Sequence, residues 1–174
     1  MKGAFQGENE IIINSSREKV WQILTDGTVL SRWMRIVKHT TSRQECLGAV
    51  RSCDVEMNGK MGKVREKCVL FEEPERIGWE MQFDTFGFSK MFNNYGFSFE
   101  LEPLDHSRTR VVNKGFYDPK NFVVSMMNAL FMRKKSAEIR MTALTNLKQL
   151  AESLTTYTHD QQTDIPVLSR PEAV

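Results

Sequence analysis

Asp118–Leu154, with the sequence DPKNFVVSMMNALFMRKKSAEIRMTALTNLKQLAESL, predicts the longest element of the chain. Asp118 is a favourable N-cap residue, and Pro119 would occupy the first helical position, where its missing N–H costs nothing. No glycine and no further proline occur before Pro166. A single helix of about 36 residues and about 54 Å is therefore predicted.

The apolar residues of this stretch fall on one side of the predicted helix. They recur at spacings of three, four or seven, apart from one gap at residues 131–136, and so form a single stripe. A helix this long with a polar far side needs one large apolar surface to lie on. The stripe consists of Met126, Met127, Leu130, Ala137, Met141, Leu144, Leu147 and Ala151.

The residues before this helix predict the surface that it covers. Phe5–Ile13 is predicted as the first strand. Two short helices should follow, the first opened by a capping box of Ser15 and Glu18, the second covering Thr28–Met34. From Ile36 to Tyr117 the pattern changes to a run of five or six antiparallel strands, with period-two alternation in two of them.

A hairpin is the most clearly marked feature of the strand region. Ala49–Met57 and Met61–Phe71 flank Asn58-Gly59, a pair that supplies the positive φ angles of a type I′ turn. A two-residue turn places Arg51 opposite Glu66; a four-residue turn would change the partners but leave each residue on the same face.

Arg51 and Glu66 are therefore expected to point inward and to form an ion pair, because a buried charge must be paired. Two interpretations remain open at this point. The pair could hold two strands together at a cavity rim, or it could anchor a ligand and act as a general acid or base. Their inward neighbours on the hairpin are predicted to be Cys53, Val55, Val64, Cys68 and Leu70.

Two further strands alternate apolar and polar residues and should present an aromatic face to the interior. The first contains Ile77, Trp79, Met81 and Phe83, and the second contains Tyr95, Phe97, Phe99 and Leu101. Tyr95 is the preferred hydrogen-bonding residue of this wall because it carries a hydroxyl group. Asn113 is expected to project inward beside Phe97.

Composition narrows the classes of function. The 174 residues predict one domain at residues 1–154 and a disordered tail at 155–174, and the net charge of +2 is spread too evenly to predict nucleic-acid binding. No signal sequence or membrane span is recognisable, and the three cysteines indicate a reduced cytoplasmic location. Because His39, His106 and His159 lie far apart, no metal site is predicted. No glycine-rich phosphate-binding loop is present either, and no cofactor is predicted.

Several segments resemble one known family. VWQILTD at Val20–Asp26 and SRWM at Ser31–Met34 resemble a segment of the SRPBCC superfamily of START/Bet v-like (birch-pollen-allergen-like) proteins. Gly48–Arg51, Glu72–Trp79 and Phe99–Leu104 resemble later strands and turns of its polyketide cyclase/dehydrase-like branch. Each motif is loose, but their order and spacing span nearly the whole predicted domain.

The resemblance implies an α+β helix-grip fold. In this fold a curved antiparallel sheet of six to seven strands wraps around a long C-terminal helix, with two short helices after strand one. Sheet and helix enclose a deep apolar cavity. Members of the superfamily bind lipids, sterols, polyketides or other hydrophobic molecules, and a minority catalyse cyclisation or dehydration.

Three functions are consistent with these observations. The leading hypothesis is binding of a hydrophobic small molecule, as a carrier or sensor. The alternatives are a polyketide cyclase/dehydratase, in which Glu66 abstracts a proton while Arg51 or Tyr95 stabilises an enolate, and a protein-interaction module of the chaperone-activator type. The predicted ligand-binding residues are Arg51, Cys53, Val55, Val64, Glu66, Cys68, Trp79, Met81, Phe83, Tyr95, Phe97, Phe99, Asn113, Met127, Leu130 and Lys134.

The segment Phe122–Met132 is apolar on nearly all sides. We expect the loop around Phe86–Phe92 to cover it. If it is instead exposed, it would suit a cavity mouth, a homodimer contact or a transient membrane contact, without stable insertion.

Overall fold

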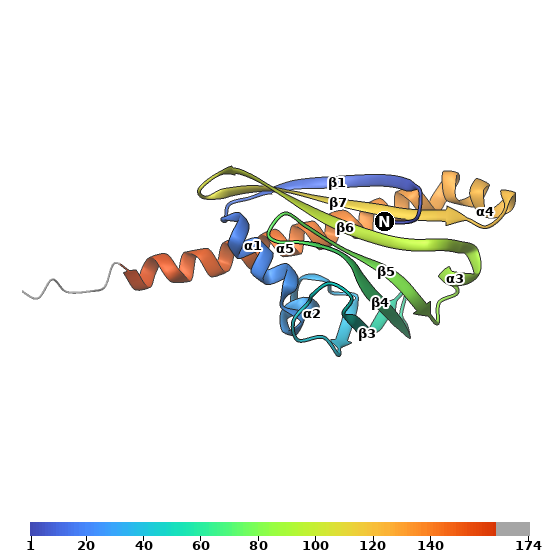
Figure 1. Cartoon of the computed structure of the whole chain (residues 1–174), viewed down its shortest axis with the longest axis horizontal. Coiled ribbons are helices and arrows are strands. Elements are labelled where there is room, and N and C mark those ends of the chain that lie inside the picture. The colour runs from blue at the N-terminus through green and yellow to red at the C-terminus, as the bar shows by residue number, and fades with distance from the viewer. Residues whose placement is uncertain (163–174) are drawn as a thin grey trace, which may run out of the picture.

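The computed structural model describes the backbone of residues 1–162 and the side chains of residues 1–153. Seven antiparallel strands form one curved sheet in the order β1-β7-β6-β5-β4-β3-β2, which Figure 1 shows wrapping around the long helix. The strands are β1 (Phe5–Ile13), β2 (Val37–Thr40), β3 (Val50–Met57), β4 (Lys60–Glu72), β5 (Arg76–Asp84), β6 (Phe92–Asp105) and β7 (Arg108–Pro119).

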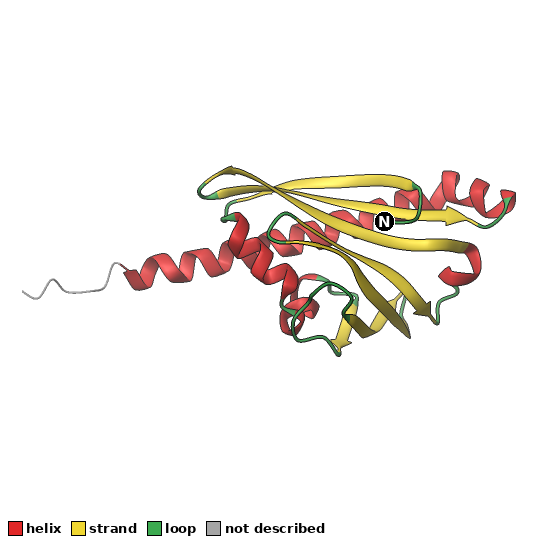
Figure 2. Ribbon diagram, in the orientation of Figure 1, coloured by secondary structure: helices red, strands yellow, loops and turns green. Residues whose placement is uncertain are grey.

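The short helices after β1 lead from one edge of this sheet to the other, and the long C-terminal helix covers one of its faces (Figure 2). After β1 the chain passes through two short helices to β2 at the opposite edge, and then returns strand by strand to β7. This is the predicted α+β helix-grip fold. The helical segments are α1 (Arg17–Thr25), the 3-10 turn η1 (Gly27–Val29), α2 (Leu30–Trp33), α3 (Phe88–Met91), α4 (Phe122–Met127), the π-helical turn η2 (Asn128–Met132) and α5 (Arg133–Gln162).

α5 extends beyond the domain boundary predicted at residue 154, and the rest of the predicted tail lies outside the described residues. The N-terminal cap of α1 also differs from the prediction. Its N-cap is Ser16, whose hydroxyl accepts the backbone N–H of Lys19 at 3.4 Å. Ser15 is instead buried at the end of β1, where its carbonyl accepts the hydroxyl of Thr109.

The long helix begins later than the sequence predicted. Asp118 and Pro119 still belong to β7, and the N-cap is Asn121, whose side chain accepts the N–H of Val124. The Asp118 carboxylate is used elsewhere, since it accepts hydrogen bonds from the backbone of Ala4 and the side chain of Asn94. A capping residue and a proline therefore marked the end of a strand rather than the start of a helix.

A π-helical turn interrupts the long helix and overlaps the start of the gap in the apolar stripe. This turn, η2, contains Asn128, which is buried and accepts the hydroxyl of Tyr117 at 2.7 Å. A π turn holds more residues than an α turn and therefore rotates the residues before it relative to those after it. As a result Met127 and Leu130 face solvent, while Leu144 is fully buried.

The interior divides into a packed half and a hollow half. In the packed half, Trp33 meets Phe99 edge to face at a centroid distance of 5.7 Å, and Leu144 and Leu147 of α5 are completely buried. The side chain of Asn146 donates to the carbonyl of Trp33 and ties α5 to α2. The hollow half lies towards the N-terminal end of α5.

The predicted hairpin is confirmed. Asn58 and Gly59 have φ angles of 52° and 72°, as a type I′ turn requires. Arg51 pairs with Glu66, and Cys53 with Val64, in the two-residue register.

Two β-bulges change the faces predicted farther along β4 and β5. Arg65 pairs with Phe83 but Glu66 pairs with Met81, so one extra residue in β5 reverses the alternation. Phe83 consequently points outward, is 45% exposed and lies near the guanidinium of Arg65. A second bulge after Cys68 turns Leu70 to the outer face in the same way.

Candidate functional site

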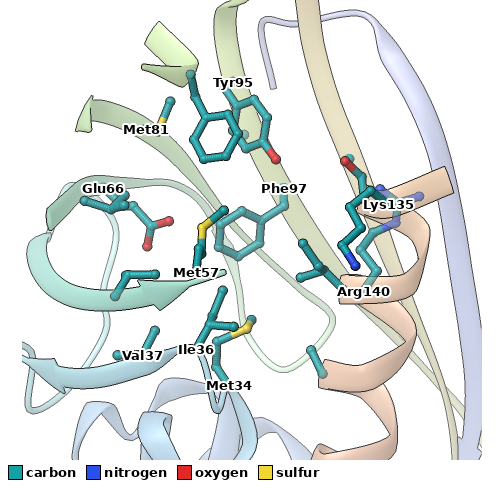
Figure 3. Close-up of a pocket in the computed structure, with 18 of the residues that line it drawn as sticks. Met34, Ile36, Val37, Met57, Glu66, Met81, Tyr95, Phe97, Lys135 and Arg140 are labelled. Atoms are coloured by element: carbon teal, nitrogen blue, oxygen red, sulfur yellow. The ribbon is translucent and has the colours of Figure 1, made fainter. Parts of the chain in front are cut away.

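The hollow half of the interior contains a cavity of about 460 Å³ between the sheet and the start of α5. This volume lies within the range of small-molecule sites, which is about 300–1,000 Å³. Most of its wall is apolar, with polar groups at two ends (Figure 3). The apolar wall includes Met34, Ile36, Val37, Val55, Met57, Val64, Met81, Phe97, Met132, Ile139 and Ala143.

One end of the cavity is formed by the Arg51 cluster, which consists of Arg51, Glu45 and Glu66. Nε of Arg51 donates to Glu66 at 2.8 Å, and Nη1 donates to Glu45 at 3.0 Å. The guanidinium lies 4.3 Å from the ring centroid of Trp79, whose indole N–H donates to the second oxygen of Glu45. Two carboxyl groups and one aromatic face therefore surround Arg51, which is only 4% exposed.

These surroundings fix the charge states of two groups. Burial alone would lower the pKa of Arg51, but attraction by Glu66 and Glu45 outweighs it, so the pKa is raised and the guanidinium remains charged. Burial, and secondarily the charge of Glu66, raises the pKa of the Cys53 thiol. Cys53 is therefore a neutral wall residue and a poor nucleophile near neutral pH.

Glu45 was missed by the sequence prediction. It precedes the hairpin in a segment without hydrophobic periodicity, so no local pattern marks it as buried. Its backbone N–H donates to the carbonyl of Thr25 at 2.8 Å, which fixes this segment against the end of α1. Only the three-dimensional arrangement brings Glu45 to Arg51.

The other end of the cavity, the Arg140 end, is formed by Arg140, Tyr95, Tyr117 and Ser136. The rings of Tyr95 and Tyr117 stack at a centroid distance of 5.2 Å. Burial raises the pKa of Tyr95 to about 12, helped by Tyr117 and opposed by Arg140, so the phenol remains protonated. Burial lowers the pKa of Arg140, whose Nε donates to the side-chain oxygen of Asn9 at 3.0 Å.

The cavity wall includes nine of the predicted ligand-binding residues, although their binding role remains a prediction. The expected inward ion pair of Arg51 and Glu66 is confirmed, and Asn113 does face the interior, where its side chain donates to the carbonyl of Ser98. The nine are Arg51, Cys53, Val55, Val64, Glu66, Met81, Tyr95, Phe97 and Asn113.

The other seven predicted residues do not line the cavity. Cys68, Trp79 and Phe99 are fully buried in the packed half of the interior. The bulge in β5 turns Phe83 outward. Because the π turn changes the helical phase, the cavity receives Phe131, Met132, Lys135, Ser136, Ile139, Arg140 and Ala143 of the helix in place of Met127, Leu130 and Lys134.

The apolar start of the helix is exposed, so its predicted burial beneath the loop around Phe86–Phe92 is wrong. Phe122 is 82% exposed and Phe131 is 71% exposed. Phe131 also lines the cavity, which indicates that the cavity meets solvent beside this segment. A homodimer contact through the segment Phe122–Met132 remains a prediction. None of the helices within the described residues is long and apolar enough to span a membrane.

Residues 4–152 match the family model described as polyketide cyclase/dehydrase and lipid transport. The chain belongs to this family. The match covers nearly all of the domain predicted from the sequence, and the resemblance to the polyketide cyclase/dehydrase-like branch is confirmed. Among curated proteins, none matches the chain.

Solved structures similar to this chain share its fold. A START superfamily protein from Mycobacterium smegmatis has 18% identity and a TM-score of 0.68, with 85% of this chain and 97% of that chain covered. The Zhui aromatase/cyclase from Streptomyces sp. R1128 has 13% identity and a TM-score of 0.66, with 84% and 92% covered. The ginseng major latex-like protein 151 from Panax ginseng has 10% identity and a TM-score of 0.64, with 83% and 97% covered. At these identities the likeness concerns the fold alone.

Proposed function

We propose that this protein binds a hydrophobic small molecule in the cavity between its sheet and α5. The observation that carries the proposal is the cavity of about 460 Å³ with its mostly apolar wall. Transfer of an apolar guest from water into such a site is favourable by about 25 cal/mol per Å² of buried apolar surface. The polar groups at the two ends would fix its orientation.

Membership of a family described by polyketide cyclisation and lipid transport supports a hydrophobic ligand. Methionines contribute much of the apolar wall, namely Met34, Met57, Met81 and Met132. Their flexible side chains adapt to guests of different shape, which suits a carrier or a sensor.

Binding is tested with the neutral fluorescent hydrophobe N-phenylnaphthylamine, together with native mass spectrometry of freshly purified protein. We expect saturable fluorescence enhancement and, for a carrier, a co-purifying hydrophobic molecule. Ala143→Phe fills the cavity from α5 and should weaken probe binding at least about tenfold, because the guest and the added ring compete for one space.

Thr142→Phe is the matched control, since Thr142 is exposed on the same helical turn. It adds the same ring outside the cavity and should leave probe binding unchanged. Equal loss of binding in the two variants, or no binding by the unmodified protein, would reject the proposal.

A second candidate is a cyclase/dehydratase reaction in the same cavity. It is favoured by Glu66, whose carboxyl group lies on the cavity wall with Oε2 held by Arg51 at 2.8 Å (Figure 3). Glu66 would remove a proton, and the protonated Tyr95 would donate to the developing enolate. In an assay with a substrate that the protein converts, Glu66→Gln should abolish turnover and leave substrate binding nearly intact. Equal loss of turnover and binding would exclude this role of Glu66.

The chaperone-activator type of interaction module does not require an interior space of this size. The cavity therefore lends this third function no support.

A further inference from the structure

Arg140 is half-buried and, unlike the buried Arg51 at the other end of the cavity, has no counter-charge among residues 1–153. Within residues 1–153 it forms no ion pair, and its one side-chain hydrogen bond runs from Nε to the amide oxygen of Asn9. A guanidinium group carries five N–H donors, so the donors of its two terminal nitrogens remain available. Figure 3 shows Arg140 and Glu66 on opposite sides of the cavity.

Two paired glycines make room for this guanidinium against the sheet. Gly7 of β1 pairs with Gly115 of β7. A Cβ at Gly115 would lie 2.9 Å from Nη1 of Arg140, and a Cβ at Gly7 would lie 3.4 Å from Nη2. Any side chain at Gly115 would thus displace the guanidinium from its present place.

Further hydrogen-bond donors face the same end of the cavity. Tyr95 and Ser136 line it, and each has a hydroxyl group. Arg140, Tyr95 and Ser136 together offer donors of three kinds and no carboxylate. The chemical group that best satisfies such a set is a carboxylate, which accepts through two oxygens and matches the fork of a guanidinium.

We propose that the Arg140 end binds the carboxylate of an apolar acid, such as a fatty acid or an aromatic acid, whose hydrocarbon part fills the rest of the cavity. This inference rests on the proposed function and specifies its ligand class. The Arg51 cluster orients the same ligand, because two carboxyl groups facing one guanidinium disfavour a further anion at that end.

The test compares dodecanoate with dodecanol by isothermal titration calorimetry at slightly alkaline pH, where the acid is ionised. The two ligands share one chain and differ only in the head group. Since hydrogen bonds to a charged group are stronger than those to a neutral hydroxyl, dodecanoate should bind at least about tenfold more tightly. Arg140→Gln should remove this preference and change dodecanol binding less than about threefold.

Arg133→Gln is the control, because it removes the same charge from the same helix at an exposed residue that contacts Gln6 and not the cavity. It should retain the preference for the acid. If dodecanol binds but dodecanoate binds no more tightly, or if Arg140→Gln leaves the preference intact, the inference is overturned while the proposed function stands. If neither ligand binds, the proposed function falls and the inference falls with it. If Arg140→Gln does not fold, the wild-type comparison still overturns the inference when the acid is not preferred, and Lys135→Gln then tests whether the preference arises at the rim.

Discussion

The two arginines that enter the cavity have opposite surroundings. Arg51 lies between Glu45 and Glu66 and is 4% exposed, so its charge is balanced within the protein. Arg140 lies against the paired Gly7 and Gly115, and within residues 1–153 its side chain forms one hydrogen bond, to the amide oxygen of Asn9. We infer that the two residues have different roles: Arg51 holds two strands together, and Arg140 binds an anionic ligand.

This division follows from where each arginine sits. Arg51 is in the middle of β3, and its pairing with Glu66 across the hairpin is set by the Asn58-Gly59 turn. Arg140 is on α5, after the π turn, and faces a part of the sheet where glycine replaces larger side chains. Arg51 therefore has an ion-pair partner on the neighbouring strand, whereas Arg140 has open space beside the glycines of the sheet.

The largest expected effect is on stability. Arg51→Met leaves Glu45 and Glu66 without their cation in the interior and should lower the free energy of unfolding by about 3–5 kcal/mol. Arg140→Met leaves no stranded carboxylate and should change it by less than about 1 kcal/mol. Urea denaturation of both variants measures the difference, and equal destabilisation would show that the two arginines do not have distinct roles.

The next effect concerns the glycine beneath Arg140. Gly115→Ala places a methyl group against Nη1, and the flexible arginine side chain moves before the backbone does. We expect dodecanoate affinity to fall about tenfold, from loss of a charge-assisted hydrogen bond, with little change in dodecanol affinity. Calorimetry would show unchanged dodecanoate binding if the position of Arg140 does not matter.

A third effect is visible at alkaline pH. The pKa of Tyr95 is raised from 10.0 to about 12 in the folded protein, so folding favours the protonated phenol. Its contribution to stability is complete below pH 10 and is lost as the pH rises towards 12. Because the charge of Arg140 opposes this rise, Tyr95 should titrate at a still higher pH in Arg140→Met.

The ultraviolet absorbance of the phenolate measures this titration, and Tyr95→Phe identifies which tyrosine is responsible. An unchanged Tyr95 titration in Arg140→Met would mean that the guanidinium does not act on this end of the cavity.

The smallest expected effect is at the rim. Lys135 lines the cavity but forms an exposed ion pair with Glu138 at 3.3 Å. Solvent screens such a pair, so Lys135→Gln should weaken dodecanoate binding less than about threefold. A loss as large as that of Arg140→Gln would move the anion site from the interior to the rim.

The sequence predicted the parts of this molecule that short-range rules determine. Alternation predicted the strands, Asn58-Gly59 predicted the hairpin register, and that register correctly paired Arg51 with Glu66. The family resemblance supplied the helix-grip fold and the expectation of a cavity, which no local pattern reveals.

The errors arose where one residue changes the phase of an element. The bulge near Met81 turns Phe83 outward, and the π turn replaces Lys134 with Lys135 at the cavity. One inserted residue moves all later residues of a strand or helix to a different face. The sequence does not reveal this shift, because apolar residues such as Leu130 also occur on the exposed side. Glu45 lies only six residues before Arg51, but it belongs to an irregular segment, and no periodic pattern in the sequence marks its contact with Arg51.

A crystal structure of the complex with dodecanoate carrying bromine at its far end is the most direct measurement. The anomalous signal of bromine locates the end of the chain, and the electron density locates the carboxylate. We predict the carboxylate within hydrogen-bonding distance of Arg140 and the bromine among Met34, Ile36 and Met57. A carboxylate against the Arg51 cluster, or a ligand bound only outside the cavity, would contradict the division between the two arginines.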